Sequence, residues 1–117
     1  MEYTHIDANS VHILGTEYII LKRSERDDKR LNVCDGYCDW TTKQIVVKQE
    51  MRGNLGNMDF YMKKVIRHEI IHAFALESGL RESSLDTASW AANEEMVDWF
   101  AIQSPKIFQV FNELDIL

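Results

Sequence analysis

The stretch His68-Glu69-Ile70-Ile71-His72 predicts both a local fold and a functional site. It lies within a segment that has the pattern of one long helix, where residues four positions apart share a face. His68 and His72 can therefore bind one metal ion together, and Glu69 lies at the side where a metal-bound water would be. This spacing indicates a two-histidine metal site with a carboxylate base beside it.

Local signals bound the helix that carries this motif. Asn57 follows a cluster of glycines and asparagines and can cap a helix over residues 58–78. Gly79 then supplies a left-handed stop. Charged residues lie on the arc opposite the two histidines, which predicts that the motif faces inward.

The remainder of the second half also has helical patterns. We expect a second helix over residues 91–103. Ser104-Pro105 is expected to open a third helix, because proline is favoured in the first turn. Ile107, Phe108 and Phe111 would belong to the apolar stripe of that third helix.

The first half has the composition of strands. Residues 11–14 and 17–21 are rich in β-branched and aromatic side chains, and Gly15 between them indicates a turn. Residues 44–48 are a further candidate strand.

A second turn signal, Asp35-Gly36, lies between residues 31–34 and 37–40. The order of elements predicts an α+β domain. We expect an N-terminal sheet of three to four strands, followed by about three helices that include the motif helix.

Composition narrows the class of protein. The chain has 117 residues, of which 45% are hydrophobic and 27% charged, as expected for one globular domain over residues 1–117. Its net charge of −6 argues against nucleic acid as the main partner, and no apolar run is long enough for a bilayer. The first residues lack the pattern of a signal peptide, so we expect a cytoplasmic protein with Cys34 and Cys38 as reduced thiols.

A third metal ligand would separate a metal site from two ordinary histidines. Glu94 and Asp98 are four residues apart in the expected second helix, so they share one of its faces. Glu94 can complete a His, His, Glu site, and Asp98 can accept a hydrogen bond from a ligating imidazole. Glu95 is rotated by about 100° from Glu94, which favours a solvated position.

These residues carry a family resemblance. His68-Glu69-x-x-His72 followed by Asn93-Glu94-x-x-x-Asp98 resembles the gluzincin pattern of zinc peptidases. The compact arrangement is similar to the small metallopeptidases of phages and mobile elements, of the ImmA/IrrE type, across roughly residues 35–101. The resemblance implies a small zincin-like fold in which a short sheet precedes the motif helix.

The expected activity is hydrolysis of peptide bonds with one Zn²⁺ per chain, bound by His68, His72 and Glu94. Glu69 would act as the general base that activates the water. The resemblance also implies that the strand before the motif helix is a sheet edge to which an extended peptide adds. The residues expected to contact the substrate are Gln44, Ile45, Val46 and Val47.

Several alternatives stay open at this stage. A donor for the reaction's oxyanion can come from Tyr37, Tyr61, His5 or His12. The partner is a peptide or protein, and a single repressor-like regulator would fit a protease that serves a mobile element. The alternative function is a catalytically idle zinc-binding or protein-interaction module of the same fold. Residues 80–89 are a candidate exosite.

Overall fold

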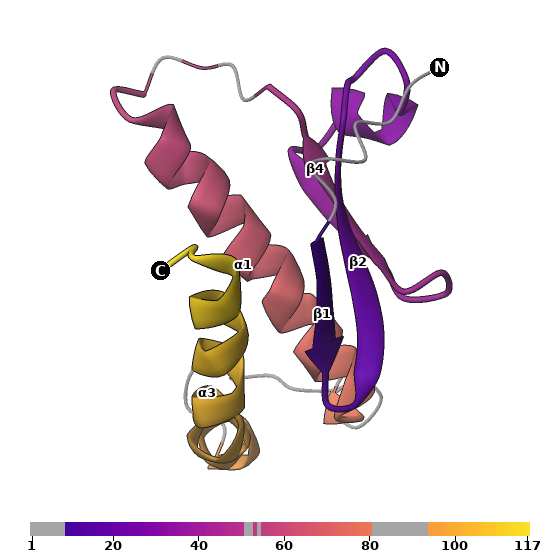
Figure 1. The fold of residues 1–117 in the computed structure, drawn as a ribbon. Helices are drawn as coiled ribbons and strands as arrows, with labels where there is room; N and C mark the ends of the chain where they lie inside the picture. The colour runs from indigo at the N-terminus through magenta and orange to yellow at the C-terminus, as the bar shows by residue number, and fades with distance from the viewer. Residues whose placement is uncertain (1–8, 51–52, 54, 81–93) are drawn as a thin grey trace.

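The computed structural model describes residues 9–50, 53, 55–80 and 94–117, with the side chains of residues 94, 95, 97, 98 and 101 outside the description. The elements follow one another as strands and then helices (Figure 1). They are β1 (Asn9–Ile13), β2 (Thr16–Arg23), the 3₁₀-helix η2 (Lys29–Asn32), β3 (Gly36–Asp39), β4 (Gln44–Lys48), α1 (Met58–Glu77) and α3 (Glu94–Leu114). This order confirms an α+β domain with a four-stranded sheet.

The four strands form one mixed sheet in the order β1-β2-β4-β3. β1 and β2 form an antiparallel hairpin, and so do β3 and β4. The two hairpins join through a parallel pair, β2 with β4, in which Ile19 lies opposite Gln44. β1 and β3 are therefore the two outer strands of the sheet.

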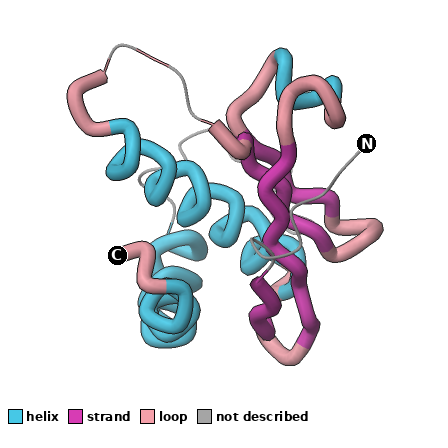
Figure 2. The backbone as a smooth tube through the Cα atoms, turned by 45° about the horizontal axis from the view of Figure 1, so that its top comes forward, coloured by secondary structure: helices cyan, strands magenta, loops and turns pink. Residues whose placement is uncertain are grey.

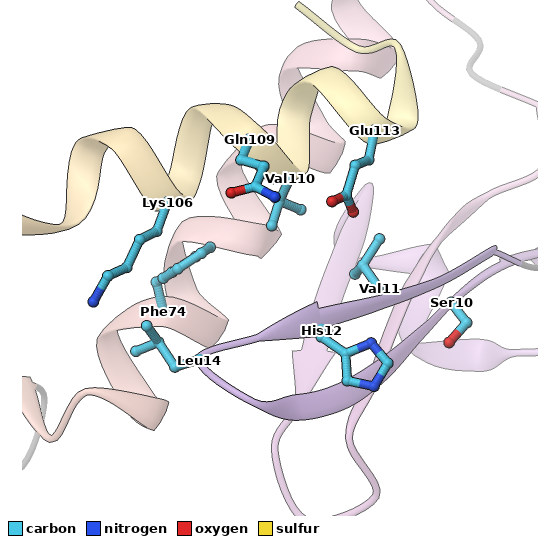
Figure 3. Close-up of a pocket in the computed structure, with 9 residues that line it drawn as sticks. All are labelled: Ser10, Val11, His12, Leu14, Phe74, Lys106, Gln109, Val110 and Glu113. Carbon is cyan, nitrogen blue, oxygen red and sulfur yellow. The ribbon is translucent and has the colours of Figure 1, made fainter.

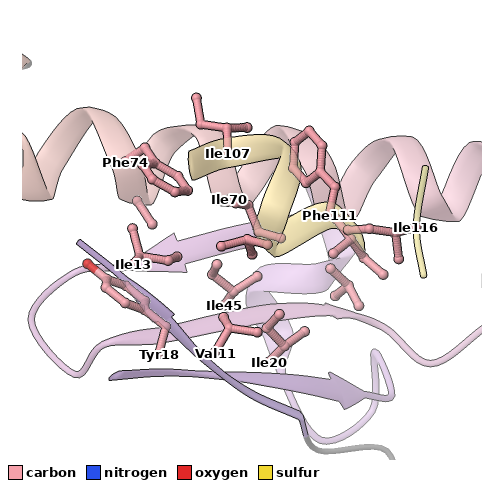
Figure 4. Packing of buried hydrophobic residues seen from close by; sticks show 14 of the residues in the cluster. Val11, Ile13, Tyr18, Ile20, Ile45, Ile70, Phe74, Ile107, Phe111 and Ile116 are labelled. Carbon is pink, nitrogen blue, oxygen red and sulfur yellow. The ribbon is translucent and has the colours of Figure 1, made fainter. Parts of the chain in front are cut away.

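Both helices cover the same face of the sheet, as the ribbon and the tube show from two directions (Figures 1 and 2). α1 packs over β3 and β4, and α3 reaches β1. Between the two layers lies one apolar core (Figure 4). The core includes Val11, Ile13, Tyr18, Ile20, Ile45, Val47, Val65, Ile66, Ile70, Ala73, Phe74, Ile107, Val110 and Phe111.

The bounds expected for the motif helix are confirmed. The Asn57 side chain accepts a hydrogen bond from the Phe60 backbone N–H at 2.9 Å, so it caps α1 as its residue type predicts. Gly79 follows the helix with a φ of 81°, a conformation that glycine adopts without strain. In the described part of the chain, no helix combines the length and hydropathy that a membrane span requires.

The turn expected at Asp35-Gly36 is a bend at Asp35, and Gly36 is already the first residue of β3. Leu31 is fully buried within η2, and Asp28 caps this short helix by accepting a hydrogen bond from the Arg30 backbone N–H. The segment before β3 is therefore a 3₁₀ turn anchored by a core side chain. The β3–β4 hairpin closes instead over residues 40–43, where Lys43 has a φ of 58°.

The third helix expected at Ser104-Pro105 was also wrong, because α3 continues through Pro105. Trp99 on one side of the proline and Ile107 on the other both pack against the same core. Apolar contacts on both sides therefore hold one continuous helix where the local signal predicts a boundary. The described residues contain two α-helices.

Candidate active site

The orientation of α1 follows from its apolar stripe. Val65, Ile66, Ile70, Ala73 and Phe74 are buried against the sheet, and Glu69 lies within the same stripe. The two histidines lie on the adjoining face and are exposed. The expectation that the motif faces inward was therefore wrong for the two histidines, while Glu69 and Ile70 are buried toward the sheet.

The two imidazole rings converge on one point. The Nε2 atoms of His68 and His72 are 3.1 Å apart, and the ring planes meet at 73°. Two nitrogen ligands of one tetrahedral zinc, each with a bond of about 2.0–2.1 Å, lie roughly 3.3 Å from each other. This separation is that of a hydrogen bond between the two rings, and it also fits two ligands of a shared ion.

Glu69 stands beside this pair in a different environment. Its side chain is 8% exposed, and among the described residues its carboxylate has no hydrogen-bond partner. Burial raises the pKa of Glu69 to about 6. Burying a carboxyl group with no internal partner costs folding free energy, and carboxyl groups with raised pKa values cluster at functional sites, where they can transfer protons.

A cavity of about 560 Å³ lies on the sheet side of the histidines. Glu69 and His72 form part of its wall, and the opposite wall comes from the outer strand β3 and the residues next to it. These residues are Cys34, Gly36, Tyr37, Cys38 and Trp40. The candidate base and one candidate ligand therefore face a sheet edge across a space that can admit a ligand.

The main chain of β3 is available along this edge. The backbone N–H of Lys48 donates to the carbonyl of Asp35 at 3.1 Å, which fixes which residues of the hairpin exchange hydrogen bonds. In an antiparallel pair such residues alternate along the strand. The N–H and C=O groups of Gly36 and Cys38 therefore point away from β4, off the outer edge of the sheet.

The position expected for residues 44–47, at an edge of the sheet, was wrong. β4 is paired on both sides, by β2 and by β3, so its main chain has no free edge. Its central residues Ile45, Val46 and Val47 are at most 1% exposed, and Gln44 is half-buried. The strand next to α1 in sequence is an inner strand, and β3 takes the outer position beside the motif.

A second cavity, of about 590 Å³, lies on the other side of the histidines and is almost wholly apolar. α3 contributes Met96, Trp99 and Phe100 to its lining. The Trp99 indole N–H donates to the Ser78 hydroxyl at 2.7 Å, which ties the start of α3 to the end of α1. The first turns of α3 therefore lie beside the histidine pair. The other lining residues are His68, Ile71, His72, Ala75 and Leu80.

The third ligand stays a prediction. α3 begins at Glu94, so Glu94 and Asp98 stand one turn apart in the helix that borders the histidines. The side chains of Glu94, Glu95 and Asp98 lie outside the described residues. Among the described side chains, no third histidine, cysteine or carboxylate joins the pair.

Of the oxyanion donors proposed from the sequence, Tyr37 lines the cavity beside Glu69, but its hydroxyl group is already engaged. Tyr37 donates its hydroxyl proton to Asp28, and Tyr61 donates to Asp35. His12 is on β1, at the opposite edge of the sheet from β3, and His5 lies outside the described residues. Sequence reasoning missed Trp40, whose side chain lines the cavity beside Glu69 and carries an indole N–H. No local pattern distinguishes it, because the turn after β3 places it there.

Comparison of the chain with protein-family models, with curated proteins and with solved structures finds no match. Its function is therefore inferred from the geometry and chemistry of the site.

Proposed function

We propose that the protein is a zinc-dependent peptidase that hydrolyses peptide bonds of a protein substrate. The observation that carries this proposal is the convergence of the His68 and His72 Nε2 atoms to 3.1 Å, with the buried carboxylate of Glu69 on the next residue. Two neutral imidazoles and an adjacent carboxylate base are the side chains that metal-assisted hydrolysis needs.

His68 and His72 would hold the zinc, and Glu94 is proposed as the third protein ligand. When bound, zinc supplies a Lewis acid that polarises a carbonyl group and lowers the pKa of water. Asp98 is proposed to accept a hydrogen bond from the second ring nitrogen of a ligating histidine, which would fix its tautomer.

Glu69 would accept a proton from the attacking water and deliver it to the leaving amine. Its place in the wall of the cavity under β3 supports this role, because a peptide lying along β3 would cross in front of the carboxylate. The outward N–H and C=O groups of Gly36 and Cys38 can pair with such a peptide as an added strand. The proposed substrate contacts are therefore on β3, whereas the sequence analysis expected them on β4.

The test compares the wild type with Glu69→Gln and His72→Ala, using elemental analysis for zinc and a proteome-derived peptide library for hydrolysis. We expect the wild type to hold one zinc per chain and to cleave peptides. Glu69→Gln should keep the zinc and lose cleavage, because an amide keeps the shape but cannot accept the proton. His72→Ala should lose both.

Two outcomes would contradict the proposal. Full zinc occupancy in His72→Ala would remove the histidines as ligands. Zinc retained by the wild type without any cleavage of the library or of a cell lysate would favour the catalytically idle zinc-binding module.

A further inference from the structure

The edge of the sheet opposite β3 is formed by β1, and the direction of its main-chain groups follows from its neighbour β2. The Ile19 backbone N–H donates to the Lys43 carbonyl at 3.1 Å, so odd-numbered residues of β2 face β4. Even-numbered residues of β2 therefore face β1.

β1 presents two residues to the outside. Asn9, Val11 and Ile13 lie opposite even-numbered residues of β2 and are used in the hairpin. The N–H and C=O groups of Ser10 and His12 consequently point off the edge of the sheet. Native edge strands are commonly protected by lysine, inward charges or proline. β1 has the sequence N-S-V-H-I, which contains none of these.

α3 runs beside this edge and forms a groove of about 550 Å³ with it (Figure 3). Lys106, Gln109 and Glu113 extend from α3 along the groove, while Ser10 and His12 line it from β1. The close-up shows Lys106 toward the Leu14 end of β1 and Glu113 toward the Ser10 end. The groove is therefore positive at one end and negative at the other.

The two charges are available for an external partner. Lys106 and Glu113 are exposed, and neither makes an ion pair with any residue that the structure describes. They stand seven residues apart, which is two turns of one helix face, with Gln109 between them. The same face carries Ile102, a large apolar side chain that is 56% exposed.

The charge pattern on this face of α3 is complementary to the same face of a second copy. When two such helices meet antiparallel across a two-fold axis, Lys106 of each copy faces Glu113 of the other. One two-fold axis relates the two ion pairs, as a symmetric interface requires. The same axis can also relate two copies of β1, because two identical edge strands pair antiparallel about a two-fold axis.

We infer that the groove between β1 and α3 is a self-association surface whose partner is a second copy of this chain. Ser10 of each copy exchanges main-chain hydrogen bonds with His12 of the other, and the Lys106–Glu113 pairs close the interface on the helix layer. The two four-stranded sheets become one continuous sheet. Since β3 is at the far edge, both histidine pairs stay open, and the inference does not depend on the proposed function.

The main test is sedimentation equilibrium of the full chain with two charge reversals. We expect a wild-type dimer, and for Lys106→Glu or Glu113→Lys alone a dissociation constant at least about tenfold higher, because two attractive pairs become repulsive. An equimolar mixture of the two variants should recover wild-type affinity, since each introduced charge then meets its opposite. Lys29→Glu, an exposed reversal on η2, controls for net charge and should leave the dimer unchanged.

A second variant tests the strand. His12→Pro removes one outward N–H while leaving the β1–β2 hydrogen bonds of Val11 and Ile13, so it should dissociate the dimer. Circular dichroism of this variant should match that of the folded wild-type monomer obtained at high dilution. A wild type that stays monomeric, or a mixture of the charge variants that associates no better than either alone, would overturn the inference.

Discussion

Gly36 is a residue of β3 at which an added side chain would crowd both β4 and α1. A Cβ atom there would lie 3.0 Å from Val47 Cγ1, 3.1 Å from the Val46 carbonyl oxygen and 3.1 Å from Val65 Cγ1. The backbone oxygen cannot give way as a side chain can, so only glycine fits without moving the strand. The packing of β3 against β4 and α1 therefore depends on this absence of a side chain.

We predict that Gly36→Ala destabilises the protein by about 1–3 kcal/mol, the usual cost of overpacking. Urea unfolding followed by circular dichroism measures this change. Gly56→Ala is the matched control, because a Cβ at Gly56 meets nothing within 4 Å and the substitution should be close to neutral. Equal effects of the two substitutions would contradict a tight contact at β3.

Glu77 is a second residue whose contacts make a testable contribution to stability. Its carboxylate accepts hydrogen bonds from Lys43, Tyr18 and Thr16, at 2.7, 2.7 and 2.9 Å, and so joins the end of α1 to the sheet. The hydrogen bond from Lys43 is the largest influence that holds the pKa of Glu77 below its ordinary value, and those from Tyr18 and Thr16 act in the same direction.

A carboxyl group whose pKa is lowered by folding stabilises the native state above its unfolded pKa of about 4.3, and this contribution is lost as the pH falls through the folded value. We predict that Glu77→Gln costs on the order of 1 kcal/mol at neutral pH. The difference from the wild type should shrink below about pH 4. Thermal unfolding of both proteins between pH 3 and about pH 7 measures it, and a constant difference would remove Glu77 as the titrating group.

At the scale of elements, the sequence was most informative where the signal is local. The cap by Asn57, the stop at Gly79 and the four-residue spacing of His68 and His72 each depend on neighbours within one or two turns, and α1 was predictable for that reason. The place of β3 was not predictable in the same way. Strand order depends on which strands of the two hairpins pair with each other. The sequence of residues 44–48 does not indicate that they form an inner strand.

In α3 a local sequence signal, Ser104-Pro105, predicted a helix boundary, but packing against the core holds one continuous helix. Pro105 is exposed and lies inside the helix, where it lacks an N–H for the preceding turn. We predict that Pro105→Ala stabilises the protein by up to about 3 kcal/mol, because it restores a helix hydrogen bond and removes little buried area. Urea unfolding measures the gain. A loss of stability would instead indicate that Pro105 begins a separate helix, as the Ser104-Pro105 pair alone predicts.

At the scale of the whole molecule, zinc should act as a stabilising ligand. A ligand that binds only the native state at a hundred times its dissociation constant adds about 2.7 kcal/mol. We predict that zinc raises the melting temperature of wild type and Glu69→Gln by the same amount, and that a chelator reverses the shift. His72→Ala should show no zinc-dependent shift in calorimetry. An unchanged melting temperature of the wild type with zinc would contradict a site coupled to the fold.

The architecture as a whole was predictable as far as a sheet of three to four strands that precedes the helices. The candidate site was predictable as far as its spacing along α1, but its walls come from segments distant in sequence, β3 and the start of α3. Cys38 and Trp40 reach the cavity only because the β3–β4 hairpin lies on the outside of the sheet.

The parallel pairing of β2 with β4 has a consequence for how the chain folds. Each hairpin closes between residues near in sequence, whereas Ile19 meets Gln44 only after η2 and β3 have been ordered between them. Closing a longer loop costs more entropy before any contact is gained, so this pairing should form late and limit the folding rate. Substitutions along the β2–β4 boundary should then change mainly the folding rate, because the pairing that limits folding is formed in the transition state.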